Sequence, residues 1–139
     1  MKTHNSEKHN NLKAFSLIEL IFVIVVIGII ASVAIPKLMG INSKAKTSTV
    51  GSDVKTIISS IQSYYVVNKK IDKISDSVNI NSSVWNIADK EVIYKENDKD
   101  CVKITVDGTN LNLAVDETAG EVCAELVKNG TKSEVFPLN

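Results

Sequence analysis

Few side chains in this sequence could do chemistry. One carboxylate, Glu19, lies inside an otherwise uncharged run at residues 14–36. The only cysteines are Cys101 and Cys123, and both histidines lie within the first ten residues. The sequence contains no Gly-rich phosphate loop and no recognisable pair of nucleophile and base. We therefore predict that the chain is not an enzyme and needs no cofactor.

Glu19 needs a functional explanation because of the run around it. Residues 15–35 would form a helix of about 32 Å, which is long enough to cross the hydrocarbon core of a bilayer. A charge in a membrane-spanning helix costs roughly 2.5–3.5 kcal/mol at the centre and less near an end. The residues before the run carry three lysines against one glutamate. This excess of positive charge predicts a cytoplasmic amino terminus and export of everything after the run.

The order of residues around Glu19 resembles the amino-terminal signature of type IV pilins and pseudopilins. The letters KA are followed by FSLIEL and then by a long aliphatic stretch that ends in IP. By this resemblance, a prepilin peptidase cuts between Ala14 and Phe15, and the new amine of Phe15 is methylated. Alanine stands before the cut, where family members usually have glycine. The resemblance also gives Glu19 a role in assembly, in which its carboxylate neutralises the methylated amine of a neighbouring subunit.

The resemblance implies a structural subunit that assembles through its amino-terminal helix. The assembly would be a type II secretion or DNA-uptake pseudopilus, or a type IV pilus. The expected partners are other pilin or pseudopilin subunits, the prepilin peptidase, the inner-membrane assembly platform and, before assembly, the inner membrane itself. The subunit would cross that membrane once, with a periplasmic carboxyl-terminal domain, and would then enter a periplasmic or cell-surface filament.

Two other interpretations of the amino terminus stay open. A secretory signal peptide would release a domain cleaved after Ala34, although this run is longer than an ordinary signal core and contains a carboxylate. A membrane-anchored binding module that never polymerises would need the span but neither Glu19 nor a free amine on Phe15. The first residue of the mature protein, Phe15 or Ile35, separates the two cleavage sites.

The remaining residues suffice for one small domain. The expected segments are a leader at 1–14, a transmembrane or filament-core helix at 15–35 and a periplasmic domain at 36–139, with a helix continuation at 36–70, a connecting region at 71–90 and a β-sheet at 91–139. The predicted fold class is α+β and pilin-like, a long amino-terminal helix packed on a small antiparallel sheet.

Pro36 directly follows the span, and proline inside a helix removes a hydrogen bond and bends the axis. We predict a kinked continuation because helical spacing resumes with Leu38, Ile41 and Ala45. A richer apolar stripe at residues 50–65 is predicted to cover the sheet of the same chain. The earlier stripe would then face neighbouring subunits.

Alternating apolar residues predict four strands in the last third of the chain. These strands are centred on residues 91–95, 102–106, 111–115 and 122–126. The single tryptophan, Trp85, precedes them in the polar connection. We expect its side chain to anchor that connection to the core and not to bind a ligand.

An even number of cysteines in an exported chain favours one disulfide between Cys101 and Cys123, with two buried free thiols as the alternative. A simple meander of the last three predicted strands would separate the cysteines by about 10 Å, whereas a disulfide needs Cα atoms within roughly 7 Å. A disulfide therefore requires the strand predicted at 122–126, or the turn before it, to lie beside the start of the Cys101 strand.

The charge of the chain gives no reason to expect nucleic-acid binding. The sequence has 16 basic and 16 acidic residues, and removal of the leader would leave it slightly acidic. The acidic residues between positions 98 and 116 do not follow the spacing of a calcium loop. Because the leader also holds both histidines, no metal site is predicted.

Overall fold

The computed structural model describes residues 14–138, so the basic flank and all of the predicted leader except Ala14 lie outside the described residues. The chain divides into two units, Met1–Leu38 and Met39–Asn139. Helix α1, Leu17–Asn68, is the element found in both of them. The helix is continuous through Pro36, as the resumed helical spacing after it predicted. A kink at Pro36 stays a prediction.

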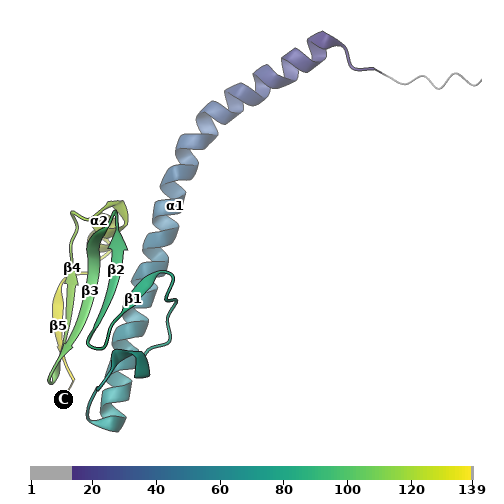
Figure 1. Cartoon of the computed structure of the whole chain (residues 1–139). Coiled ribbons are helices and arrows are strands. Elements are labelled where there is room, and N and C mark those ends of the chain that lie inside the picture. The colour runs from purple at the N-terminus through teal and green to yellow at the C-terminus, as the bar shows by residue number, and fades with distance from the viewer. Residues whose placement is uncertain (1–13, 139) are drawn as a thin grey trace, which may run out of the picture. The chain divides into compact units, whose positions relative to one another are not determined.

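The second unit contains a five-stranded sheet in which neighbours in sequence are neighbours in space (Figure 1). Every adjacent pair of strands is antiparallel. The strands are, in order, β1 Trp85–Ile87, β2 Glu91–Glu96, β3 Lys99–Asp107, β4 Asn110–Val115 and β5 Glu134–Pro137. Gly108, at a φ of 57°, lies in the tight turn between β3 and β4, and this conformation favours glycine.

The part of α1 after Met39 covers one face of this sheet (Figure 1). Val50, Val54, Ile57 and Ile61 are buried, as expected from the stripe at residues 50–65. They pack with the inward-facing residues of β2, β3 and β4, which alternate along each strand with residues on the outer face. The predicted α+β, pilin-like fold class is confirmed.

The connection between α1 and the sheet is held to the core by apolar side chains. It contains one short 3₁₀ helix, η1, at Ile74–Asp76, and the side chain of Ile74 is fully buried. Trp85 is only 1% exposed, and its ring lies 5.6 Å from that of Tyr94. The indole Nε1–H donates to the Asp53 carboxylate of α1 over 2.9 Å. The prediction that Trp85 anchors this connection is confirmed.

The strand predicted at residues 122–126 is wrong, because this segment forms helix α2, Glu121–Lys128. Its apolar residues fit both periods, since Val122 and Leu126 are one helical turn apart as well as in strand alternation. Burial shows which period applies. Cys123, which alternation would place opposite Val122, is buried together with Val122 and Leu126.

Two short strands were also missed by the sequence analysis. Strand β1 begins the sheet at Trp85, inside the segment expected to be an irregular connection, and β5 ends it at Pro137. Each has four residues or fewer and lies at an edge of the sheet. Alternation over so few residues gives too little signal to separate a strand from a loop.

Candidate functional site

The first turn of α1 brings Ser16 and Glu19 together. The Ser16 hydroxyl accepts the backbone N–H of Glu19 at 3.2 Å, and the Ser16 carbonyl accepts that of Leu20 at 3.2 Å. Ser16 is therefore the N-cap of α1, and Glu19 lies three residues later, where a carboxylate interacts favourably with the positive end of the helix. The sequence analysis missed Ser16, although Ser-x-x-Glu is a capping-box signal.

The amino-terminal part of α1 has no partner within the described chain. All of its large apolar side chains up to Ile35 are exposed, and Phe15, just before the helix, is 83% exposed. This stretch is long and apolar enough to cross a membrane, and none of it is buried. Burying such a surface in lipid or against other helices would be strongly favourable, at roughly 25 cal/mol per Å².

The three residues predicted to act in processing and assembly lie at the start of this unit. Ala14 and Phe15 are exposed and precede α1, and Glu19 is exposed in its first turn. Among the ion pairs formed within residues 14–138, none involves Glu19. The pairing of its carboxylate with the amine of a neighbouring subunit stays a prediction.

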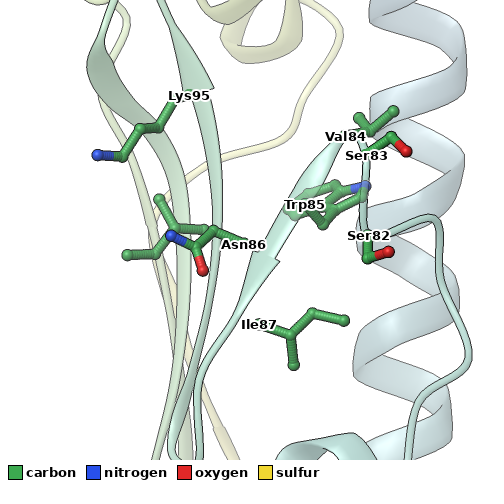
Figure 2. Close-up of a pocket in the computed structure, with 8 residues that line it drawn as sticks. Ser82, Ser83, Val84, Trp85, Asn86, Ile87 and Lys95 are labelled. Atoms are coloured by element: carbon green, nitrogen blue, oxygen red, sulfur yellow. The ribbon is translucent and has the colours of Figure 1, made fainter.

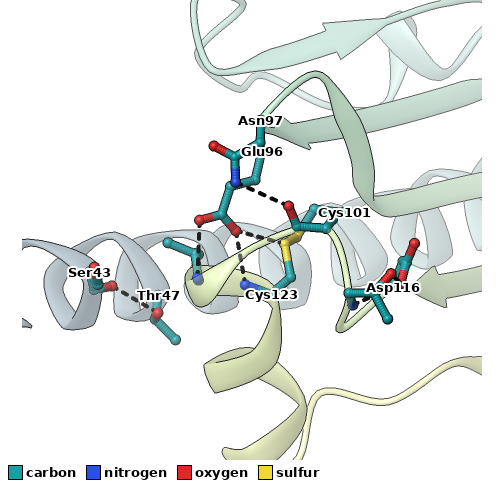
Figure 3. Close-up of a disulfide and its surroundings, with 10 residues drawn as sticks. Ser43, Thr47, Glu96, Asn97, Cys101, Asp116 and Cys123 are labelled. Atoms are coloured by element: carbon teal, nitrogen blue, oxygen red, sulfur yellow. Dashed lines mark hydrogen bonds between the residues drawn. A yellow bond between two sulfur atoms is a disulfide. The ribbon is translucent and has the colours of Figure 1, made fainter.

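The two cysteines form the expected disulfide in the second unit (Figure 3). The Cα atoms of Cys101 and Cys123 are 5.7 Å apart. The turn before α2 lies beside the start of β3, because the side-chain amide of Asn97, just before β3, donates to the Ala119 carbonyl over 3.2 Å. This is one of the two arrangements that the sequence analysis required. Because Cys123 lies on a helix, the disulfide is compatible with a sheet of simple sequential order.

A carboxylate from the neighbouring hairpin caps α2 beside this disulfide. Glu96, the last residue of β2, accepts the backbone N–H groups of Val122 and Cys123, each at 3.2 Å (Figure 3). Its Oε2 also lies 2.9 Å from the Cys123 Sγ. A sulfur in a disulfide carries no proton, so this last approach is a close contact and not a hydrogen bond.

Two further groups shape this corner of the domain. The Asp116 carboxylate accepts the hydroxyl of Thr118 at 2.7 Å and its backbone N–H at 2.9 Å. These two hydrogen bonds lower the pKa of Asp116 below its ordinary value. Burial, and secondarily the nearby Glu96 carboxylate, raise the pKa of Tyr94.

The disulfide corner also has the composition of a metal site. One ligand atom from each of Glu96, Cys101 and Cys123 lies within 4.8 Å of the others. The two sulfurs are bonded to each other, however, and two backbone N–H groups point at the carboxylate. A cation would have to displace both N–H donors and would need the disulfide reduced, so this donor set does not fit a metal in the oxidised protein.

A pocket of about 410 Å³ runs along the outer side of β1 (Figure 2). Its walls include Ser82, Ser83, Asn86 and Lys95. Neither hydroxyl has a histidine, cysteine or carboxylate among the other wall residues to act as its base. Trp85 also lines the pocket, but its side chain is buried against the core and so is not available to stack on a ligand.

Comparison with known proteins gives matches that include the amino-terminal segment. Residues 9–35 match the family model of the prokaryotic N-terminal methylation motif. The type II secretion system core protein G of Klebsiella michiganensis is 35% identical over 63 residues, which are 45% of this chain and 44% of that relative. The protein of the same description from Pectobacterium carotovorum is 34% identical over 58 residues, which are 42% and 37% of the two chains. No solved structure gives a significant match.

The fold is that of an α+β protein with a long amino-terminal helix, apolar in its first part, and an antiparallel sheet. The methylation motif and the similarity to core protein G support a type IV pilin-like family for this chain. This confirms the family expected from the residues around Glu19. The match spans less than half the length of these curated relatives.

Proposed function

We propose that this chain is a pseudopilin, a structural subunit that assembles through the amino-terminal part of α1. The observation that carries the proposal is an apolar helical surface without a partner in the described chain, which lies inside a methylation motif at residues 9–35. The pocket at β1 and the disulfide corner hold no catalytic set, which favours a structural over an enzymatic role.

The first step in this proposal is processing at the inner membrane. The prepilin peptidase removes residues 1–14 by cutting between Ala14 and Phe15, and the new amine of Phe15 is methylated. Both residues are exposed at the start of α1, which suits attack by an enzyme. The subunit then waits in the inner membrane with residues 15–35 as its span and residues 36–139 in the periplasm.

The second step is extraction of α1 from lipid into the core of a filament by the assembly platform. There the Glu19 carboxylate of one subunit would pair with the Phe15 amine of its neighbour. In a water-poor bundle, loss of either partner leaves an uncompensated charge, which costs several kcal/mol. The pair would therefore fix the register between subunits more than it adds net stability. A bend at Pro36 would let the two parts of α1 take different directions in the filament.

The relatives named as type II secretion system core proteins favour the pseudopilus of a type II secretion machine. A DNA-uptake pseudopilus and a type IV pilus use the same kind of subunit. They differ from a secretion machine in the genes beside the subunit gene and in what the cells export or import.

The test is the substitution Glu19→Ala in the full-length chain, expressed in cells that assemble the filament. We expect normal cleavage, with Phe15 as the first residue, and about tenfold less subunit in sheared filaments, because a buried amine is left unpaired. The measurements are amino-terminal sequencing and immunoblots of the filament and membrane fractions.

Two variants separate the proposed charge pair from the helix cap. Glu19→Asp keeps the charge and should retain part of the assembly, whereas Ser16→Ala weakens the cap but leaves the carboxylate and should assemble almost normally. Normal incorporation of Glu19→Ala would exclude the proposed pair. A wild-type chain that stays in the membrane and never enters a filament would instead favour a membrane-anchored binding module.

A further inference from the structure

The Glu96 carboxylate lies against the disulfide in a way that capping of α2 does not require. Its Oε2 is 2.9 Å from the Cys123 Sγ, and the same oxygen accepts the Cys123 N–H. Capping needs only the backbone N–H groups of the first turn. The contact with sulfur therefore places a negative charge beside a disulfide, a group that can undergo two-electron reduction.

The surroundings leave that charge without a cation. Glu96 takes part in none of the ion pairs formed among residues 14–138. Lys99 is its cross-strand neighbour at the β2–β3 hairpin, yet the two form no pair within 4 Å. Glu96 itself is half-buried, and the sulfur-bearing residues Cys101 and Cys123 are 1% and 0% exposed. A charge in this position is only partly screened by water.

Thiol–disulfide exchange brings negative charge close to the Glu96 carboxylate by either route. In the first route an external thiolate attacks Cys123 Sγ, the bond between the cysteines breaks, and Cys101 leaves as a thiolate. In the second, the thiolate attacks Cys101 and Cys123 leaves. A second external thiolate then attacks the mixed disulfide, so the protein gains two electrons and two reductant thiols become one disulfide.

The position of Cys123 in the first turn of α2 increases the effect of the Glu96 carboxylate on the stability of a Cys123 thiolate. A cysteine in the first turn of a helix normally has a stabilised thiolate, because free N–H groups point at it. Here Glu96 already accepts the N–H groups of Val122 and Cys123. The helix end therefore offers little stabilisation to a Cys123 thiolate, and the carboxylate repels it.

We propose that Glu96 is an electrostatic guard that slows reduction of the Cys101–Cys123 disulfide by external thiols. The reactants that it opposes are anionic thiolates, both small thiols and the thiolate of a dithiol oxidoreductase. The guard acts on both routes because it opposes the approach of the anionic thiolate to Cys123 in the first and the departure of Cys123 as a thiolate in the second. This inference does not depend on filament assembly.

The test measures the rate of reduction of the folded full-length chain in detergent by a matched pair of small thiols. Mercaptoethanesulfonate carries a negative charge beside its thiol, and cysteamine carries a positive one. In wild type we expect the cationic thiol to react about tenfold faster than the anionic one. In Glu96→Gln, which keeps an oxygen to accept from α2, both rates should rise and the difference between the thiols should shrink.

The control variant is Glu117→Gln, which removes an equal charge from an exposed residue that precedes α2. It should leave both rates close to those of wild type. An equal acceleration by both thiols in Glu96→Gln would mean that the variant only loosens α2, and it would overturn the guard. Unchanged rates in Glu96→Gln would overturn it as well. In denaturant, where the contact is lost, wild type and Glu96→Gln should be reduced at the same rate.

Discussion

At the scale of single residues, Gly120 allows Glu96 to reach the first turn of α2. A Cβ added at Gly120 would overlap the carboxyl group of Glu96. The backbone φ of Gly120 is 173°, an extended conformation that any residue adopts. Glycine is therefore needed here for space and not for backbone freedom, which is a reason that cannot be recognised in a sequence without the fold.

We predict that Gly120→Ala destabilises the domain by about 1–2 kcal/mol, because the Glu96 side chain must move away and α2 loses its cap. Urea unfolding of the full-length chain in detergent, followed by tryptophan fluorescence, would measure the loss. The same substitution in a Glu96→Ala background should cost much less, since the overlap no longer exists. Equal costs in both backgrounds would contradict the proposed overlap.

The position of Glu19 has a local explanation in the isolated helix as well as the proposed contact with a second subunit. Its place after the N-cap Ser16 gives the carboxylate a favourable position in the isolated helix. That local effect stabilises the first turn by a few tenths of a kcal/mol to about 1 kcal/mol. This effect explains an acidic residue near the start of the helix without a second subunit. The Ser16→Ala variant is therefore needed to separate stability of the first turn from contact between subunits.

At the scale of elements, β1 is attached to α1 through a single directed bond. Trp85 Nε1–H donates to Asp53 Oδ2, and both groups are removed from most of the solvent. We predict that Asp53→Ala lowers the free energy of unfolding by about 1–3 kcal/mol, because the buried indole N–H is left without an acceptor. Asp53→Asn keeps an acceptor oxygen and should cost less. Urea unfolding, with the two variants compared, measures this difference.

Sequence reasoning worked for the elements with a long and unambiguous period. The stripe at residues 50–65 and the alternation in β2, β3 and β4 each involve several residues on one face, so α1 and the central hairpins were predicted. It failed for α2, where Val122 and Leu126 fit both the helical and the strand period, and for β1 and β5. The disulfide partner of Cys123 followed from the cysteine count. The contact of Glu96 with α2 could not be predicted, because it depends on how the β2–β3 turn and the segment after β4 come together in the fold.

At the scale of the whole second unit, the disulfide joins β3 to α2 across a sequence separation of 22 residues. A loop of this length stabilises a protein by roughly 3 kcal/mol in the chain-entropy model. We predict that replacing both cysteines with serine lowers the thermal midpoint by roughly 10–20 °C. Circular dichroism of the full-length chain in detergent measures the shift. A midpoint equal to that of wild type would contradict a stabilising disulfide.

The sequential order of the five strands has a consequence for the way the domain is made. Each strand pairs only with the strand before and after it in the chain, so its contacts close short loops and have low contact order. In a chain exported as proposed, strands β1 to β4 would therefore join α1 one at a time as each emerges. Cys101 on β3 would stay reduced until Cys123 arrives on α2. Oxidation of the pair would then join β3 to α2 before β5, the last strand to emerge, completes the sheet against β4.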